Sequence, residues 1–480
     1  MGLRTVKEYK EGLRDNREVW ILGEKVEDVT THPMLRVGVE SAALDYEMAE
    51  DPKYRDLAVA EHPETGEPIS RHYYIPKTAE DLLKRHELIV TATRLGDGVI
   101  PFTKDVAGDS LNAVMVTAQV MGREEYIERI TDYYEHVRKR DLSVACGMTD
   151  VKGDRSLHPS SPDQTHPDFY VRVVERNDEG IVVRGSKMHI TAAPYCDDIL
   201  VLPCRAMREA DKDYALCFAV PANAEGLKHI CHPMRYQQSP LEFPVDVPIR
   251  MHTESLLVFD DVFIPWERVF LCGEWQYAGT LAYNFSFFHR HTASCYRIAM
   301  TELQLGMAQA IAEYNGIERA SHVREKITDM IIYLETLKSL ARAACSDPVM
   351  HGGIAVPNPV VTNLSKYHFA ENYHRFVKMI QDLAGGILIT APTYKDWQNP
   401  ELRGYIEKYL GGRKGVPTEH RLRMLQLIRG WMASDIGGGL EVLALHAEGS
   451  LQAQRLIIYG EYQKQLQEYK ERAKRLAGIK

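Results

Sequence analysis

Several kinds of sequence signal are missing from this chain of 480 residues, and each absence excludes a class of protein. The eight cysteines form no CxxC pair, and their spacing matches no zinc or iron–sulfur module. No apolar run is long enough to span a bilayer, and the charged, amphipathic start is not a signal peptide. The net charge of -9, without a basic stripe, argues against a nucleic-acid surface. We therefore expect a cytoplasmic protein with reduced thiols and no membrane or nucleic-acid partner.

The common glycine-rich nucleotide signatures are also missing. There is no GxGxxG after a strand and no Walker loop, so any dinucleotide must be bound by another arrangement. Internal repeats and low-complexity tracts are absent. Charged residues make up 26% and hydrophobic residues 45% of the chain, which is the balance of an ordinary globular protein.

The order of hydrophobic patterns predicts an α+β chain in three parts. Residues 1–140 read as an N-terminal α-helical domain, and a helix start signal at Lys77–Leu83 opens one of its helices. Residues 141–275 contain short β-branched runs and read as a central small β-barrel. Residues 276–480 read as a C-terminal bundle of long helices. Wide apolar helix faces of this kind are often buried against copies of the same chain, so we expect a homotetramer.

Particular segments carry these predictions. The expected strands lie at 168–175, 180–185, 198–204, 214–221 and 255–265. The expected long helices of the last part lie at 285–313, 321–344, 365–383 and 420–445. Earlier in the chain, residues 77–95 and 110–137 follow the same helical spacing, with a break at Gly96, Gly98 and Pro101 between them.

Residues 141–194 are the most informative stretch for function. A polar loop at Met148, Thr149 and Asp150 precedes two strand-like runs, and a Gly185-Ser186-Lys187 turn leads to Thr191. Backbone donors and a hydroxyl held by a rigid sheet suit the edge of a flat redox-active heterocycle. An ordinary β-hairpin with a polar turn explains the same pattern, so the residues alone leave both interpretations open.

Two motifs in this stretch resemble a known family. The run MTDVKGDRS at 148–156 and the run VVRGSKMHIT at 182–191 are similar to the flavoprotein family that holds 4-hydroxybutyryl-CoA dehydratase and 4-hydroxyphenylacetate 3-monooxygenase. The resemblance extends from about residue 5 to about residue 460 and is stronger to the dehydratase branch. It implies an FAD cofactor, a tetramer and an acyl-CoA dehydrogenase-like fold.

The resemblance also implies which residues contact the flavin. The contacts from the central part are Met148, Thr149, Arg155, Lys187, His189 and Thr191, and those from the bundle are Gln381, Gly385 and Gly386. Strand alternation predicts that Lys187, His189 and Thr191 share one face, although a lone histidine there is more often structural. Two glycines after a helix are ordinarily a C-cap, but glycine also lets the backbone approach a pyrophosphate.

The family's iron–sulfur ligands are mostly absent. In the dehydratase, a histidine and a cysteine seven positions later bind a [4Fe-4S] cluster, together with two cysteines from an earlier loop. Here His289 is kept, Tyr296 stands seven positions later, and Cys295 lies one place early. The matching loop, residues 96–109, contains no cysteine. Because a cluster needs four ligands, we expect no cluster and no metal.

The catalytic groups implied by the resemblance are also changed. Glu448 is retained and is expected to serve as a general base, although a surface carboxylate paired with Arg455 is the plain alternative. Arg297 replaces the dehydratase lysine. Cys146 stands where the monooxygenases have a histidine, either as a packed small residue or as a thiol beside the flavin. The arginine and tyrosine of the monooxygenase loop are missing.

Three functions remain open at this point. The first is an FAD-dependent enzyme that acts on a short acyl-CoA thioester by isomerisation, oxidation or elimination, with proton abstraction at the α carbon. The second is a two-component monooxygenase that uses reduced FAD from a flavin reductase to hydroxylate a phenolic acid. The third is a flavin-binding paralogue without catalysis. We expect the first.

Overall fold

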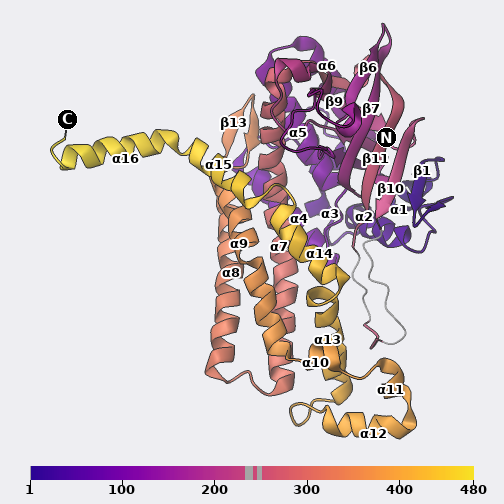
Figure 1. Cartoon of the computed structure of the whole chain (residues 1–480), viewed down its shortest axis with the longest axis vertical. Helices are drawn as coiled ribbons and strands as arrows, with labels where there is room; N and C mark the ends of the chain where they lie inside the picture. The colour runs from indigo at the N-terminus through magenta and orange to yellow at the C-terminus, as the bar shows by residue number, and fades with distance from the viewer. Residues whose placement is uncertain (1, 233–241, 246–250, 480) are drawn as a thin grey trace. The chain divides into compact units, whose positions relative to one another are not determined.

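The computed structural model describes residues 2–232, 242–245 and 251–479 (Figure 1). The chain divides into two compact units. Unit one comprises the described residues up to 232, then residues 251–292 and Met350–Ala355. Unit two comprises residues 242–245, 293–349 and 356–479. The expected mixture of helices and strands is confirmed.

Unit one contains two sheets. The larger has six strands in the order β2 (Glu24–Lys25), β1 (Glu18–Ile21), β10 (Leu227–His232), β11 (Glu254–Pro265), β7 (Gly180–Thr191) and β6 (Arg172–Arg176). The smaller has four strands in the order β12 (Val269–Cys272), β9 (Leu216–Pro221), β8 (Asp198–Val201) and β5 (Val144–Gly147). All five predicted strand segments are confirmed. Among the described residues the strands form open sheets, so the predicted closed barrel is wrong.

The N-terminal part is not purely helical, contrary to the prediction. Strand β1 pairs in parallel with β10, and a turn at Leu22-Gly23 returns the chain into β2. A short hairpin of β3 (Val59–Glu61) and β4 (Pro68–Ser70) follows. Sequence periodicity missed these strands because each is only two to four residues long. The partner of β1 also lies far along the chain.

Helices of unit one pack around the sheets. They are α1 (Val6–Gly12), α2 (Leu35–Glu50), α3 (Arg55–Ala58), α4 (Ala79–Leu95), α5 (Lys104–Met121) and α6 (Glu124–Arg140). The predicted start of α4 is confirmed, because Thr78 and Asp81 cap each other's backbone reciprocally. The predicted continuous run through 110–137 is two helices, separated at Gly122, whose φ of +66° ends α5. Every residue of α5 from 104 to 118 is buried.

The main hydrophobic core of unit one lies between the sheets and the first two helices. It joins Tyr9 and Tyr46 from α1 and α2 to inward-facing strand residues such as Val183, Phe218 and Leu257. The rings of Tyr9 and Tyr46 stack at 4.6 Å. Burial of alternate strand positions fixes the register of β7 against β11, and therefore fixes which side chains of β7 face outward.

Helix α7 (Trp275–Asn315) begins in unit one and continues into unit two. The remaining helices of unit two are α8 (Ser321–Ser346), α9 (Pro359–Ala384), α10 (Ile387–Thr390), α11 (Tyr394–Gln398), α12 (Pro400–Tyr409), α13 (Thr418–Met432), α14 (Asp435–His446), α15 (Leu451–Glu461) and α16 (Gln463–Leu476). A small hairpin is formed by β13 (Val349–His351) and β14 (Ile354–Val356). Figure 1 shows α8 and α9 side by side, and α16 extending away from them.

The predicted long helices of unit two are confirmed, with one exception. The run at 420–445 is two helices rather than one, because the chain leaves helical geometry at Ala433. The Ser434 hydroxyl then accepts hydrogen bonds from the backbone of Ile436 and Gly437, which starts α14. No helix within the described part of the chain is both long and apolar enough to cross a bilayer.

Candidate functional site

The loop after β5 is fastened to β7 by backbone and side-chain contacts. The Met188 amide donates a hydrogen bond to the Thr149 carbonyl at 2.8 Å. Next to it, Asp150 and Lys187 form an isolated antiparallel bridge. Met148 and Thr149 are partly exposed at the end of β5. The structure therefore brings the two sequence motifs together and presents this loop on a rigid support.

Lys187 is buried inside this junction. Its ammonium group lies 2.8 Å from the Asp150 carboxylate and donates to the carbonyls of Met148 at 3.0 Å and Leu202 at 2.8 Å. The three N–H donors of the Lys187 ammonium group therefore have three acceptors, all within unit one. The side chain stabilises the loop that carries Met148 and Thr149, and any effect on a cofactor passes through that loop.

His189 does not share a face with Lys187, and that prediction is wrong. A bulge in β7 places two residues opposite the single residue Leu256 of β11. His189 has a φ of +61°, and both it and Met188 are exposed while Lys187 is buried. The bulge therefore interrupts the strand alternation on which the prediction relied.

Thr191 contacts a carboxyl group that sequence reasoning did not single out. Thr191 pairs with Glu254 across β7 and β11, and its hydroxyl lies 2.9 and 3.0 Å from the two carboxylate oxygens. Burial raises the pKa of Glu254 to about 7, and the hydrogen bond from Thr191 opposes this rise only in part. A carboxyl group with such a pKa can give or take a proton near neutral pH.

Cys146 lies within β5, next to the loop that carries Met148. Burial raises the pKa of its thiol well above the ordinary value. The side chain is therefore a neutral thiol at neutral pH, with little thiolate for nucleophilic chemistry. This favours the interpretation of Cys146 as a packed small residue.

Arg155 and the predicted glycine loop present open surfaces. Arg155 is exposed in the loop that follows β5. In unit two, Gly385 ends α9 with a φ of +75°, and no atom lies within 4 Å of the position a Cβ would take on Gly385 or Gly386. Gln381 donates to the Met432 carbonyl at 2.7 Å and ties this loop to α13. The loop is both a helix cap and an accessible stretch of backbone.

Glu448 and Arg297 form a buried ion pair in unit two. Arg297 donates to one carboxylate oxygen of Glu448 at 2.6 Å, and the Tyr296 hydroxyl donates to the other at 2.8 Å. The Lys366 ammonium lies 3.7 Å from the same carboxylate. Burial alone would lower the pKa of Arg297. The negative charge of Glu448 more than offsets this effect, so the pKa of Arg297 is raised. The expected alternative pairing with Arg455 is wrong, because Arg455 donates to the Tyr367 hydroxyl instead.

Glu448 also occupies an unusual backbone conformation. Its φ is +54°, in the short connection between α14 and α15. A non-glycine residue in the left-handed region costs about 1–3 kcal/mol, so surrounding contacts must hold it there. The ion pair with Arg297 and the hydrogen bond from Tyr296 provide such contacts.

His289 is held by a buried carboxylate of α5. Its Nδ1 lies 3.2 Å from Asp109, which is fully buried. The imidazole stacks on Phe285 at 4.8 Å, and the ring of Phe102 meets it edge-on at 5.9 Å. Phe102 belongs to the loop in which the resemblance places two cluster cysteines, so an aromatic ring lies against the retained histidine there.

Comparison with known proteins identifies the family of the chain. Residues 5–271 match the model described as 4-hydroxyphenylacetate 3-hydroxylase N terminal, and residues 278–478 match the model described as its C terminal. The chain belongs to the 4-hydroxyphenylacetate 3-hydroxylase family. The resemblance stated from the sequence is thereby confirmed.

Relatives from both branches of this family span nearly the whole chain. A 4-hydroxybutyryl-CoA dehydratase/vinylacetyl-CoA-Delta-isomerase from Clostridium aminobutyricum is 33% identical and covers 100% of both chains. A 4-hydroxyphenylacetate 3-monooxygenase oxygenase component from Thermus thermophilus is 31% identical over 98% of this chain and 96% of its own.

Solved structures from both branches share the fold. An archaeal 4-hydroxybutyryl-CoA dehydratase from N. maritimus has a TM-score of 0.90 at 30% identity, and the match covers 100% of this chain and 95% of that one. The oxygenase component of 4-hydroxyphenylacetate 3-monooxygenase, complexed with FAD, has a TM-score of 0.89 at 29% identity, with 98% of each chain covered.

The carboxylate of Asp109, 3.2 Å from Nδ1 of His289, is a possible metal ligand beside this histidine. Among the described residues, one group of three or more histidine, cysteine or carboxylate side chains lies close enough to hold an ion, and it consists of His86, His291 and Cys295. His289 is not part of that group.

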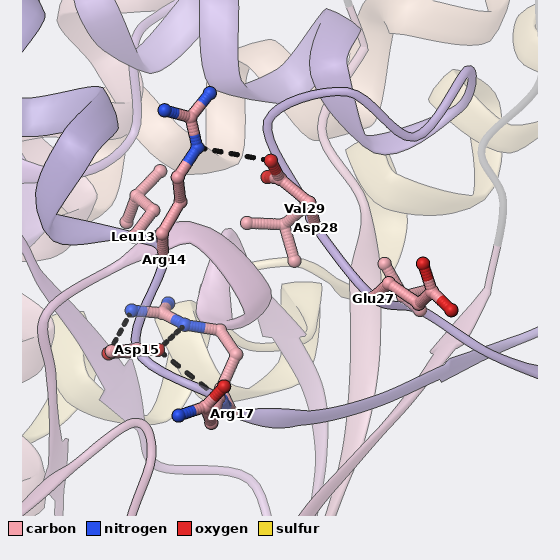
Figure 2. A pocket seen from close by; sticks show the side chains of 9 residues that line it. Leu13, Arg14, Asp15, Arg17, Glu27, Asp28 and Val29 are labelled. Atoms are coloured by element: carbon pink, nitrogen blue, oxygen red, sulfur yellow. Dashed lines mark hydrogen bonds and ion pairs between the residues drawn. The ribbon is translucent and has the colours of Figure 1, made fainter.

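A small pocket near the N-terminus does not coincide with the candidate site. It has a volume of about 210 Å³ and lies between the segments 13–17 and 26–29 (Figure 2). Four of its five charged side chains pair with one another, Arg14 with Asp28 at 3.1 Å and Arg17 with Asp15 at 2.7 Å. Because these charges are already matched, the pocket offers little to an ionic ligand.

Two residues of the site were missed from the sequence, for different reasons. Glu254 stands at the first position of β11, and its significance depends on pairing with Thr191, which the sequence does not reveal. Asp109 had a visible signal: it follows Asp105 by four positions in a helix otherwise rich in small and apolar residues. Two acidic residues on the face of a buried helix need partners, and this predicts a polar network.

The raised pKa of Glu254 predicts a pH-dependent contribution to stability. The folded state keeps a proton up to about pH 7, whereas an unfolded glutamate loses it near the ordinary value of 4.5. This contribution is therefore complete below pH 4.5 and is lost as the pH rises to about 7. It amounts to about 3 kcal/mol. Denaturant unfolding at several pH values should show that Glu254→Gln lacks this decline.

The exposed Asp260 of the same strand provides the control. It pairs with Lys228 at 2.9 Å, and Asp260→Asn should keep the pH dependence of the wild type. An identical decline in the Glu254→Gln protein would show that Glu254 has an ordinary pKa.

Proposed function

We propose that this protein binds FAD and acts on a short acyl-CoA thioester by moving a proton at the carbon next to the thioester carbonyl. The observation that carries the proposal is Glu254, a half-buried carboxyl group with a pKa of about 7 that lies against the predicted flavin contact Thr191. A thioester acidifies its α C–H bond, and a base with a pKa near the working pH suits its removal.

The chain's own residues fit a flavin. The loop at Met148 and Thr149 is partly exposed and fastened to β7, and Gly385 and Gly386 offer backbone with free space around it. Solved relatives at 29% identity are complexed with FAD, one of them also with 4-hydroxyphenylacetate. When bound, FAD supplies an isoalloxazine that takes up and returns electrons during the reaction.

Within this proposal, Glu448 takes a different role from the one expected. Three donor groups surround its carboxylate, and two of them, Arg297 and Lys366, are cationic. Nearby positive charges stabilise the ionised form and make a carboxylate a weaker base. We therefore assign proton removal to Glu254. Glu448 instead holds Arg297 and the connection between α14 and α15 in place.

The alternative function is hydroxylation of a phenolic acid with reduced FAD supplied by a flavin reductase. It is supported by the monooxygenases among the relatives, including the 31% identical protein from Thermus thermophilus. The aromatic side chains of Phe102 and Phe285 at His289 also suit a phenolic ring. The third possibility is a flavin-binding paralogue without catalysis.

One experiment separates these functions. Crotonyl-CoA or vinylacetyl-CoA, added anaerobically to the FAD-loaded protein, should perturb the flavin absorbance and be turned over. NADH, a flavin reductase and a phenolic acid should give no substrate-dependent oxygen uptake. Glu254→Gln should lower turnover by about 10²- to 10⁴-fold, while Asp260→Asn should leave it unchanged. Phenol-dependent oxygen uptake without any acyl-CoA response would support the alternative, and no response to either would support the paralogue.

We further propose that the protein works without an iron–sulfur cluster. His289 lies against Asp109 and two aromatic rings, and the loop that would supply cysteines supplies Phe102. Iron and acid-labile sulfide, determined on anaerobically purified protein, should be near zero. A brown preparation with about four irons per chain would contradict this.

We also propose a cytoplasmic homotetramer. In unit two, an apolar pocket of about 330 Å³ is lined by residues of α9, α15 and α16, among them Leu364, Tyr459 and Leu466. Helix α16 is polar overall and has no buried residue, but it carries the exposed apolar side chains Leu466, Tyr469 and Leu476. All eight cysteines are free, which agrees with a reducing compartment.

The proposed tetramer can be tested by measuring the molar mass of the protein in solution. Light scattering after size exclusion should give about four times the chain mass of 54.6 kDa. Replacing Tyr459 and Leu466 by aspartate should lower that mass, because the charges oppose burial of the apolar face. Replacing the surface residue Glu468 by glutamine is the matched control. A monomeric wild type would disprove the proposal.

A further inference from the structure

The carboxylate of Asp109 is fixed in place by three donors. One oxygen, Oδ1, accepts from Arg85 at 2.7 Å and from the Thr292 hydroxyl at 3.0 Å. The other, Oδ2, faces Nδ1 of His289 at 3.2 Å. Arg85 is itself buried and also donates to the Asp105 carbonyl at 2.6 Å. The orientation of the carboxylate is therefore set before any substrate arrives.

This arrangement determines where the imidazole of His289 carries its proton. A carboxylate oxygen only accepts, so Nδ1 bears the hydrogen and Nε2 is left with a lone pair. In the part of the chain that the structure describes, Nδ1 makes the hydrogen bond of this ring. Phe285 and Phe102 limit rotation of the imidazole, and the side chain is 13% exposed. Nε2 is thus oriented and available.

His289 and Glu254 belong to the same region of unit one. The ring of Phe102 lies 5.9 Å from that of His289 and 5.6 Å from that of His252, two residues before Glu254. Burial lowers the pKa of His252 to about 4, and its Nε2 contacts the Ile100 carbonyl, so this ring is a neutral spacer. One aromatic side chain therefore links the surroundings of the two acid–base groups.

We propose that Asp109 is a positioning residue that makes His289 the second proton-transfer group of the site. The inference rests on the proposed function, in which Glu254 removes a proton from the carbon next to the thioester carbonyl. An isomerisation or elimination also needs a proton delivered, to another carbon or to the departing oxygen. Nε2 of His289, when protonated, gives that proton. The carboxylate of Asp109 holds the ring from its Nδ1 side, and the proton taken by Glu254 balances the one that His289 donates.

The decisive variant is Asp109→Asn. Arg85 and Thr292 both donate to Oδ1, so the asparagine oxygen takes that place and its amide NH₂ group faces Nδ1. The amide then donates to Nδ1, and Nε2 must carry the hydrogen. Carbethoxylation of His289, followed by peptide mass spectrometry of the FAD-loaded protein at pH 7, should slow by at least ~10-fold. The reaction needs an unprotonated ring nitrogen, and in this variant the lone pair lies on Nδ1, where the amide NH₂ group occupies it.

Asp105→Asn is the matched control. Asp105 lies one turn earlier on α5, is buried, and makes no side-chain hydrogen bond among the described residues. Burial raises its pKa well above the ordinary value, with Asp45 and Asp109 adding to the rise, so asparagine imitates its neutral form. This variant should leave the reactivity of His289 unchanged. The same loss of reactivity in both variants would show a general disturbance of α5 and would overturn the proposal.

Kinetics provide the second measurement. On the substrate that the enzyme turns over, Asp109→Asn should lower kcat by about 10²- to 10⁴-fold with little change in KM. Combined with His289→Gln it should add no further loss, because Asp109 acts through His289.

Thr292→Val, which leaves every charge in place, should give a smaller loss in the same direction if Asp109→Asn fails to fold. Wild-type reactivity of His289 in both Asp109→Asn and Thr292→Val would refute the positioning role, whichever substrate the enzyme uses.

Discussion

The structure around His289 depends on how α5 buries its charges. Lys104, Asp105 and Asp109 all lie in the interior of unit one, where an unpaired charge is costly. Lys104 binds Asp141 through both carboxylate oxygens at 2.8 Å, and Asp109 binds Arg85. The raised pKa of Asp105 makes it neutral, so it needs no cation. Removing one member of such a buried pair typically costs about 3–5 kcal/mol, so the positions of these groups are strongly constrained.

Residues with strained backbone conformations lie close to the acid–base groups described above. Phe102, His189 and Ala192 of unit one all have φ near +60°, and Glu448 of unit two has a φ of +54°. None of them is glycine, so each conformation costs energy that neighbouring contacts must offset. Phe102 precedes α5 and lies against His289, while His189 and Ala192 flank Thr191. Strain and acid–base groups therefore coincide, as is common where a fold holds a reactive arrangement in place.

The sequence predicted the elements well and the site only in part. Long periodic segments such as α8 and α9 have local signals; α8 was found to within two residues of its ends, whereas the prediction for α9 began six residues late. The two-residue strand β2 and the bulge at His189 have none, because both exist only through pairing with distant segments. The same limit applies to function. A motif located Thr191, but the carboxyl group opposite it belongs to another strand, and no periodicity of β7 points to Glu254.

Two carboxyl groups, Glu254 in unit one and Glu448 in unit two, illustrate how environment separates chemically identical side chains. Glu448 is surrounded by Arg297, Lys366 and Tyr296, and cations favour its ionised form. Glu254 is half-buried beside a threonine hydroxyl, and burial raises its pKa to about 7. A proton-transfer group must change its charge during turnover, and a carboxylate held by two cations resists that change. The family resemblance directed attention to Glu448, whereas we propose Glu254 as the group that removes the proton.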